Sequence, residues 1–247
     1  MLDPKDKNRL SRNEILDQYY SEVYQQYLYG KDLQGFGIRY FESAIEKFWK
    51  CQIPKRVLEI GGGSGEHLPY VKYVPQESYT LLDLRPVNTE VHVNQSSVSL
   101  IEKTKFVIGN AEELPFDDEH FDRVLSTCLL HHVNDVFTVL QEARRVAKSG
   151  GEIAFLIPTD PGVLNRLVKK IVSYPKLRKL SKTRPELFYA LDHKNHIGSI
   201  IEQIKCVFKN DELKFHFRPF YVKSWNLNLL TVVHVTKNSS SSLNKVI

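Results

Sequence analysis

The segment Val57-Leu58-Glu59-Ile60-Gly61-Gly62-Gly63-Ser64-Gly65 passes from apolar residues to glycine within nine positions. Its first half, residues 57–60, is typical of a buried β-strand that ends at the glycines. Glycine adopts positive φ without steric cost and lets a ligand approach the main chain closely. A helix that begins after the glycines would offer unpaired backbone amides to an anionic group. The segment therefore predicts a strand, a turn and a helix that together bind a nucleotide-like ligand.

Two common nucleotide-binding motifs do not fit these glycines. The dinucleotide fingerprint G-x-G-x-x-G would require glycine at position 66, where the chain has Glu66, and a carboxylate is a poor neighbour for a pyrophosphate. The phosphate-binding loop of nucleoside triphosphatases requires Gly-Lys followed by Ser or Thr, and no such tripeptide follows Gly65. NAD and nucleoside triphosphates are therefore disfavoured as ligands.

Short apolar runs alternate with helical patterns around this turn, which predicts a parallel sheet with helices on both faces. The predicted strands cover residues 56–60, 79–83, 105–108, 123–127 and 152–157, and the predicted helices cover residues 66–73 and 135–148. The stretch 86–102 has no convincing helical pattern, so we expect it to be irregular. Two alternating runs, residues 212–220 and 227–237, should pair as an antiparallel hairpin. The expected fold is α/β, with a mostly parallel seven-stranded sheet that ends in this hairpin.

Two helical segments lie outside this alternation. Residues 13–50 carry apolar and aromatic residues at three- and four-residue spacing, which predicts two helices around a break at residues 30–37. Residues from about 161 to 208 form a basic helical insert. We therefore divide the chain into an N-terminal helical cap, residues 1–50, and a main domain, residues 51–247, that contains the insert.

Composition excludes several classes of protein. The chain has 247 residues, of which 42% are hydrophobic, and this is enough for the core of one ordinary domain. The net charge of +5 is spread along the chain, so no nucleic-acid partner is expected. Cys51, Cys128 and Cys206 lie far apart, without the close pairing that a zinc site or a disulfide framework needs, and we predict no metal. No stretch approaches ~18 continuous apolar residues, which favours a cytoplasmic protein. The sequence leaves the oligomeric state open.

Residues 57–65 resemble the first motif of the class I S-adenosylmethionine-dependent methyltransferases, and other matches follow in the family's order. These are Asp83 at the end of the second strand, the segment Gly109 to Phe116, the run Phe121 to Val124 with its exit at Leu130 to Val133, and the helix and turn between Glu142 and Gly151. Together the matches cover roughly residues 56–158. The resemblance implies a Rossmann-like fold, S-adenosylmethionine as cofactor and methyl transfer to a small-molecule acceptor.

The resemblance also implies which residues contact the cofactor. The expected contacts are Glu59, Gly61, Gly63, Gly65, Asp83, Asn110, Ala111 and Thr127. The Asp83 carboxylate would accept hydrogen bonds from both ribose hydroxyls, because an ionised carboxylate is a bidentate acceptor. The family usually has aspartate where this chain has Asn110. The Asn110 side-chain carbonyl could still accept from the adenine amine, so the departure puts the strength of that contact in question.

A hydroxyl acceptor needs a base, because its proton must leave as the methyl group arrives. His131 and His132 follow the fourth predicted strand, and His132 is the candidate catalytic base. The phosphoethanolamine methyltransferases, which the chain resembles here, pair such a histidine with an N-terminal tyrosine. Four tyrosines could supply that partner in this chain: Tyr19, Tyr20, Tyr24 and Tyr27. The alternative is that His132 only lines the pocket.

The exit of the fourth strand argues against other methylated substrates. The enzymes that methylate the amines of bases or glutamine side chains resemble one another in an Asn/Asp-Pro-Pro-aromatic motif, whereas residues 126–129 of this chain read Ser-Thr-Cys-Leu. Since no proline precedes Cys128, we interpret it as a small buried hydrophobe and not as a nucleophile.

Acceptor specificity is expected to reside in the helical cap and the basic insert. The insert predicts either a solvated helix over the pocket or a basic amphipathic surface that contacts an anionic substrate or a membrane. Residues 192–195, Asp-His-Lys-Asn, weakly resemble a segment of bacterial methyltransferases encoded near cell-surface polysaccharide genes, so His193 and Asn195 are candidate acceptor contacts. Three functions remain open: methylation of a sugar of a surface glycoconjugate or its precursor, methylation of a lipid or quinone headgroup at the membrane, and a non-catalytic scaffold that only binds the cofactor.

Overall fold

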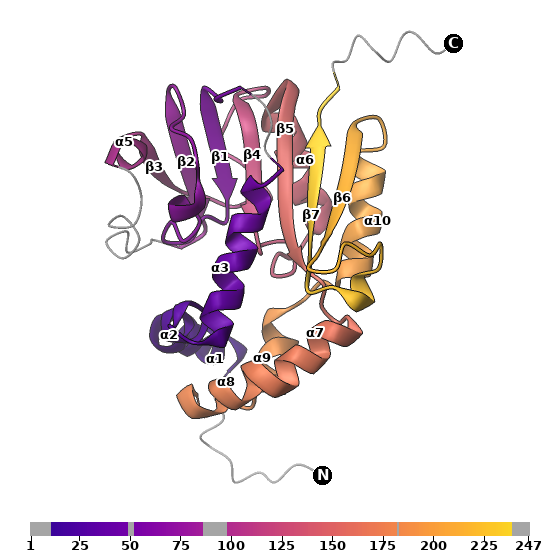
Figure 1. Ribbon diagram of the computed structural model, residues 1–247. Coiled ribbons are helices and arrows are strands. Elements are labelled where there is room, and N and C mark those ends of the chain that lie inside the picture. Colours follow the sequence, from indigo (N-terminus) through magenta and orange to yellow (C-terminus); the bar gives the residue numbers. More distant parts are fainter. Residues whose placement is uncertain (1–10, 49–51, 86–97, 182, 239–247) are drawn as a thin grey trace.

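The computed structural model describes residues 11–48, 52–85, 98–181 and 183–238, and its centre is a seven-stranded sheet (Figure 1). The strand order is β3-β2-β1-β4-β5-β7-β6. The strands are β1 (Arg56–Ile60), β2 (Ser78–Asp83), β3 (Thr104–Ile108), β4 (Phe121–Thr127), β5 (Ala147–Pro158), β6 (Glu212–Arg218) and β7 (Leu230–Thr236). Neighbouring strands are parallel except for β7, which runs antiparallel to both β5 and β6. The expected mostly parallel sheet with a C-terminal hairpin is confirmed.

Helices cover both faces of the sheet, as the sequence predicted. On one face, α6 (Val136–Val146) packs with α10 (Ile197–Val207). The Asp135 side chain caps α6 by accepting the Thr138 N–H, and the buried residues of α6 follow helical spacing: Val136, Val139, Leu140, Ala143 and Val146. On the other face, α3 (Leu33–Glu46) buries Ala44 and Ile45 against the sheet. The apolar interior strands are therefore enclosed on two sides.

The predicted helix over residues 66–73 is wrong. Turns follow the glycines, and the only regular element there is a single 3-10 turn, η2 (Leu68–Tyr70). Pro69 lies in that turn, and proline both lacks an N–H donor and disfavours helical geometry in the residue before it. The face of the sheet that this crossover leaves open is covered by α3, which contacts β5 and β7. α3, from the N-terminal segment, thus covers the face of the sheet that a crossover helix was expected to cover.

Several element boundaries also differ from prediction. The break between the N-terminal helices is short, because the Asp32 side chain accepts the Gly35 N–H and caps α3. The helix expected to end at residue 148 ends at Val146, and β5 begins directly after it. Within the stretch expected to be irregular, α5 (Val98–Glu102) is a short helix, while residues 86–97 lie outside the described part. The hairpin connection is longer than expected and contains the 3-10 turn η4 (Trp225–Leu227).

A third group of helices lies beneath the carboxyl ends of the parallel strands (Figure 1). It comprises α1 (Arg12–Gln18), η1 (Tyr19–Val23), α2 (Tyr24–Tyr29), α7 (Val163–Val168), η3 (Lys169–Ser173), α8 (Tyr174–Leu180) and α9 (Pro185–Asp192). The elements η1 and η3 are single π-helical turns. An apolar cluster of Tyr19, Val23 and Tyr27 with Leu177 and Phe188 joins the two sequence segments. Among the described residues, no helix has both the length and the apolar character to cross a bilayer.

A buried ionic network holds α3 on the sheet. The Arg123 side chain, on β4, is completely buried, and its Nη1 atom donates to Glu46 Oε1 at 2.8 Å and to the Tyr73 hydroxyl oxygen at 2.6 Å. His67 lies 3.0 Å from Glu46 and 3.3 Å from Glu42. Burial opposes a charge on His67, but the neighbouring carboxylates outweigh it and raise the pKa of His67 to about 10. Both cations are therefore charged and paired at neutral pH.

We expect Arg123→Met to lower the free energy of unfolding by about 3–5 kcal/mol, because Glu46 would lose a buried partner. Urea denaturation of the two proteins measures this difference. The matched control is Lys205→Met, which breaks the exposed pair with Glu202 and should change stability by about 1 kcal/mol or less. A loss in Arg123→Met no larger than that of the control would contradict this account of the network.

Candidate active site

The glycine turn lies at the carboxyl end of β1, between β2 and β4. The N–H groups of Gly61 and Gly62 both donate to the Leu82 carbonyl oxygen, at 2.7 and 3.1 Å, and this fixes the turn against β2. Gly61, Gly63 and Gly65 have φ values of +72°, +49° and +85°, which non-glycine residues rarely adopt. Because the strand order reverses between β1 and β4, the turn borders the crevice where open α/β sheets bind ligands.

Two polar side chains expected at the cofactor lie at or just after the carboxyl ends of the next two strands, β2 and β3. Asp83 ends β2, and its Oδ2 atom accepts the Gly63 N–H at 3.1 Å, while its Oδ1 atom accepts the Arg85 N–H at 3.1 Å. Each carboxylate oxygen keeps a further lone pair, because a carboxylate can accept about four hydrogen bonds. The Asn110 Oδ1 atom accepts the Glu112 N–H at 3.0 Å and likewise keeps one lone pair. Both side chains can therefore still accept hydrogen bonds from a ligand.

Glu59 lies deeper in the site and already has partners. Its side chain is almost fully buried, Tyr79 donates to Oε2 at 2.8 Å, and Thr127 donates to Oε1 at 3.3 Å. Burial raises the pKa of Glu59 to about 7. Glu59 and Thr127, both expected at the cofactor, are thus joined in one hydrogen-bonded group that crosses from β1 to β4.

One cavity of about 1420 Å³ brings the expected residues together. All but one of the expected cofactor residues line it: Glu59, Gly61, Gly63, Asp83, Asn110, Ala111 and Thr127. Gly65 does not, because it is buried and closes the turn through its N–H, which donates to the Gly62 carbonyl oxygen at 2.9 Å. The same cavity extends past His132 to the third group of helices, so the residues expected at the cofactor and those expected at the acceptor line one continuous space.

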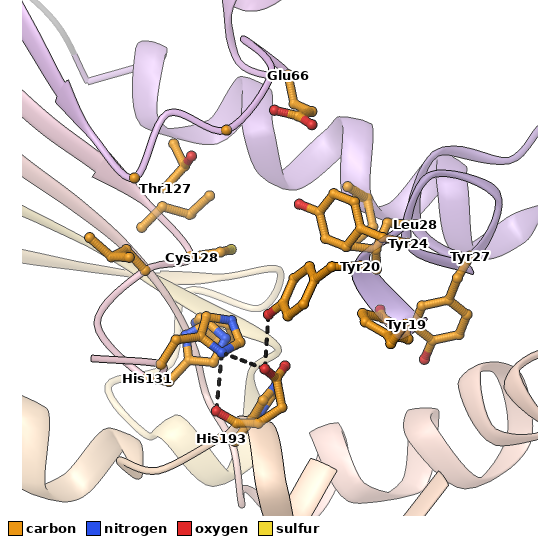
Figure 2. A pocket seen from close by; sticks show the side chains of 18 of the residues that line it. Tyr19, Tyr20, Tyr24, Tyr27, Leu28, Glu66, Thr127, Cys128, His131 and His193 are labelled. Carbon is orange, nitrogen blue, oxygen red and sulfur yellow. Dashed lines mark hydrogen bonds and ion pairs between the residues drawn. The ribbon is translucent and has the colours of Figure 1, made fainter. Parts of the chain in front are cut away.

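His132 lies on this cavity beside a carboxylate that the sequence did not point to. Its Nδ1 atom is 3.3 Å from Asp192 Oδ1 and 3.2 Å from the Asp192 carbonyl oxygen. The Tyr20 hydroxyl donates to Asp192 Oδ1 at 2.8 Å, as Figure 2 shows. Burial opposes ionisation of Asp192, but the contact with His132 outweighs it and lowers the pKa of Asp192. The carboxylate is therefore charged and orients the His132 imidazole.

A second histidine and carboxylate pair stands next to the first. His193 Nδ1 lies 2.9 Å from Asp160 Oδ2, and Lys169 Nζ donates to the same oxygen at 2.5 Å. Burial opposes ionisation of Asp160, yet His193 and Lys169 lower its pKa to about 2. Burial also lowers the pKa of His193 to about 4, so its imidazole is neutral at neutral pH.

The other residues predicted near the acceptor, the N-terminal tyrosines and Asn195, have different surroundings in the structure. Tyr20 reaches the histidines through Asp192, whereas Tyr27 donates or accepts a 2.7 Å hydrogen bond with Tyr189 and Tyr19 packs against Phe188. Asn195 does not line the cavity: its Nδ2 atom donates to the carbonyl oxygens of Leu130 and Val133 and so holds the loop after β4.

Cys128 has a φ of +52°, and desolvation raises the pKa of its thiol. A thiol with a raised pKa is a poor nucleophile, which agrees with its interpretation as a packing residue.

Sequence reasoning missed Asp160, Lys169 and Asp192. Asp192 directly precedes His193, and carboxylates next to candidate histidines are the one local signal that could have found it. Asp160 and Lys169 gave no signal, because they meet His193 only through the fold.

Comparisons with known proteins agree with this geometry. Residues 58–155 match the family described as a methyltransferase domain. The chain carries a class I S-adenosylmethionine-dependent methyltransferase domain.

The relatives of this methyltransferase domain are similar over part of their length. The chain is 36% identical over 110 residues to a 2-methyl-6-phytyl-1,4-hydroquinone methyltransferase of Oryza sativa subsp. japonica, covering 43% of this chain and 32% of the relative. It is 30% identical over 155 residues to a ubiquinone/menaquinone biosynthesis C-methyltransferase of Rickettsia prowazekii, covering 58% of this chain and 60% of the relative. The chain thus spans less than two thirds of either curated relative.

Among solved structures, phosphoethanolamine N-methyltransferase 2 of Haemonchus contortus, in complex with S-adenosyl-L-methionine, has a TM-score of 0.61 to this chain. The two are 16% identical, and the likeness covers 94% of this chain and 61% of the other. This likeness shows the fold, and it includes the helices that lie beneath the sheet.

The residues around the glycine turn fit S-adenosylmethionine. A Cβ atom at Gly62 would lie 2.5 Å from Leu81 Cδ2, so glycine lets the turn pack closely against β2. Asp83 keeps free lone pairs for a ribose diol. No helix begins directly after the turn, so the helical amides expected from the sequence do not take part.

We expect Asp83→Ala to weaken S-adenosylmethionine binding by about 1.5–3 kcal/mol, because charge-assisted hydrogen bonds would be lost. Calorimetric titration measures the change. Asp83→Asn keeps an acceptor oxygen without the charge, so its affinity for S-adenosylmethionine should lie between those of the wild type and Asp83→Ala. Asp117→Ala is the control, since Asp117 is exposed and does not line the cavity. Unchanged affinity in Asp83→Ala would remove Asp83 from the cofactor site.

Proposed function

We propose that the chain transfers the methyl group of S-adenosylmethionine to a hydroxyl group of a small molecule, with His132 as the general base. The observation that carries the proposal is the contact between His132 and Asp192 on the wall of a cavity that also reaches Asp83. A scaffold that only binds the cofactor would not need an oriented histidine beside a charged carboxylate, and this argues for catalysis.

The cofactor supplies an activated methyl group, so the protein mainly has to position the acceptor and remove its proton. His132 Nδ1 faces Asp192, which favours the tautomer that donates from Nδ1 and leaves Nε2 as a proton acceptor. As the acceptor oxygen gains the methyl group, its proton passes to Nε2 of His132. Asp192 stabilises the resulting imidazolium, which then returns the proton to solvent. The products are a methyl ether and S-adenosylhomocysteine.

The lining of the cavity supports an acceptor with an apolar or aromatic body. Around the third group of helices the wall is made chiefly of aromatic and aliphatic residues: Leu16, Tyr24, Leu28, Ile38, Phe41, Val168, Val172, Phe188 and Tyr189. Such a wall favours the lipid or quinone headgroup among the acceptors considered from the sequence. The printed names of the relatives from rice and Rickettsia, which refer to a hydroquinone and to quinone biosynthesis, support a quinone-type acceptor molecule. The Rickettsia relative is named a C-methyltransferase, so the assignment of the hydroxyl oxygen rests on His132 and not on these names.

A sugar hydroxyl stays a second candidate for one reason. The wall also contains the hydrogen-bonded group of Asp160, Lys169 and His193, and closely spaced donors and acceptors of this kind suit a polyhydroxylated acceptor.

Mass spectrometry of product mixtures separates the two candidates. Hydroquinones with short isoprenoid tails should gain one methyl group in the presence of S-adenosylmethionine, and nucleotide-linked sugars should not. Methylation of the sugars alone would reverse this assignment.

A peripheral membrane contact would suit the amphiphilic acceptor. The outer side of α7 and η3 exposes Val163, Leu167 and Ile171, with exposed Arg166 and Lys170 beside them. Sedimentation with anionic and neutral liposomes tests this contact, and the expected result is binding to the anionic ones alone.

We expect His132→Ala to lower kcat by ~10²–10⁴ while the affinity for S-adenosylmethionine stays nearly unchanged. The acidic limb of the pH–rate profile, which reports protonation of the base, should disappear. His196→Asn is the matched control: His196 caps α10 from an exposed position, and asparagine can also cap a helix. Full wild-type kcat and pH profile in His132→Ala, measured with the true acceptor, would rule the base role out.

A further inference from the structure

Three histidines from separate segments converge on the cavity wall. His131 and His132 lie in the loop after β4, and His193 follows the last residue of α9. One ring nitrogen of each can be chosen so that the three atoms lie within 4.8 Å of one another. The His131 and His193 rings meet edge to face with centroids 4.4 Å apart, and all three rings line the cavity. Figure 2 labels both His131 and His193 among the side chains that line the pocket.

Two of the three rings are held in the way that metal-binding histidines usually are. A ligating histidine commonly donates its other ring N–H to a carboxylate or a carbonyl, which fixes the tautomer and the ring orientation. His132 Nδ1 faces both oxygen types on Asp192, at 3.2 and 3.3 Å, and His193 Nδ1 lies 2.9 Å from Asp160. The Nε2 atom of each ring is thereby left for a ligand, and that of His193 also lies 3.9 Å from Asp192 Oδ2.

The burial of the His131 ring is a separate observation that points to a ligand. Its side chain is only 5% exposed, and among the described residues its Nδ1 atom has no hydrogen-bond partner. A buried ring nitrogen without a partner is costly, and coordination of an ion satisfies it.

The charge around the cluster also suits a cation. Asp160 and Asp192 contribute two negative charges, and Lys169, which is paired with Asp160, contributes one positive charge. With neutral imidazoles, the group carries one net negative charge. A divalent cation bound there would therefore be stabilised by the surrounding negative charge, inside a partly enclosed cavity.

We propose that His131, His132 and His193 form a binding site for one divalent transition metal ion of the zinc type. Imidazole nitrogens suit Zn²⁺, Co²⁺ and Ni²⁺, and metal to nitrogen distances of about 2.0–2.1 Å require the three rings to draw closer around the ion. The cavity side keeps the fourth position open. A bound ion occupies the lone pair of His132, so metal binding inhibits methyl transfer. This inhibition rests on the proposed function, whereas the metal site itself does not.

The test is a titration of untagged, chelator-treated protein with Co²⁺, without S-adenosylmethionine or acceptor. We expect one ion per chain, the visible absorption of nitrogen-coordinated tetrahedral Co²⁺, and displacement of Co²⁺ by Zn²⁺. His193→Asn and His132→Gln should each lower the affinity by at least ~10-fold, and Asp160→Asn by ~10–100-fold. His196→Asn, which leaves the three histidines in place, should bind as the wild type does. Circular dichroism verifies that each variant is folded.

Two results would overturn the proposal. One is binding that is not saturable at one ion per chain, and the other is equal affinity in the folded His193→Asn and His132→Gln variants and in the wild type. The inhibition is examined separately, by adding Zn²⁺ to the methyl-transfer assay. Stoichiometric binding without inhibition would leave the metal site intact and contradict the role of His132 as base.

Discussion

The buried ion network around Arg123 allows a helix that precedes the sheet in sequence to become part of its core. The crossover after β1 contains only a 3-10 turn and cannot cover that face by itself. α3 covers it instead, and the carboxylate of Glu46 at the end of α3 meets a guanidinium from β4. His67, two residues after Gly65 closes the glycine turn, contacts the same helix. The positions of the glycine turn and of α3 therefore depend on the same buried ion pairs.

The features that sequence analysis predicted correctly are those that adjacent residues determine. The glycines after β1, the aspartate at the end of β2 and the alternation of the last two strands each carry their signal within a few positions. These signals were sufficient to predict the sheet, its C-terminal hairpin, and the glycines and Asp83 that line one part of the cavity. The helix expected after the glycines is absent for a reason that is also local, because Pro69 lies within it.

The chemistry of the acceptor region could not be predicted in the same way. Tyr20 and Asp192 are separated by 172 positions, and His132 and Asp192 by 60. The resemblance pointed to an N-terminal tyrosine near His132, but it could not select Tyr20 among four candidates or indicate Asp192. These residues meet because α9 ends beside the loop that follows β4. His132 was identified through its place after a strand, whereas the group that orients it depends on how the insert packs against the sheet.

Both π-helical turns supply a polar side chain to this region, Tyr20 from η1 and Lys169 from η3. A π turn accommodates one residue more than the surrounding α-helix would, and such turns are frequent at functional sites. Each residue of an α-helix advances the side-chain direction by about 100°. A deletion inside an ordinary α-helix would rotate one side of it by that amount, whereas loss of the extra residue of a π turn restores α-helical geometry and leaves the flanking turns nearly in register. In these two helices the extra residue therefore acts locally: it changes the direction of the side chains within the turn, among them Tyr20 and Lys169, while the rest of the helix keeps its direction.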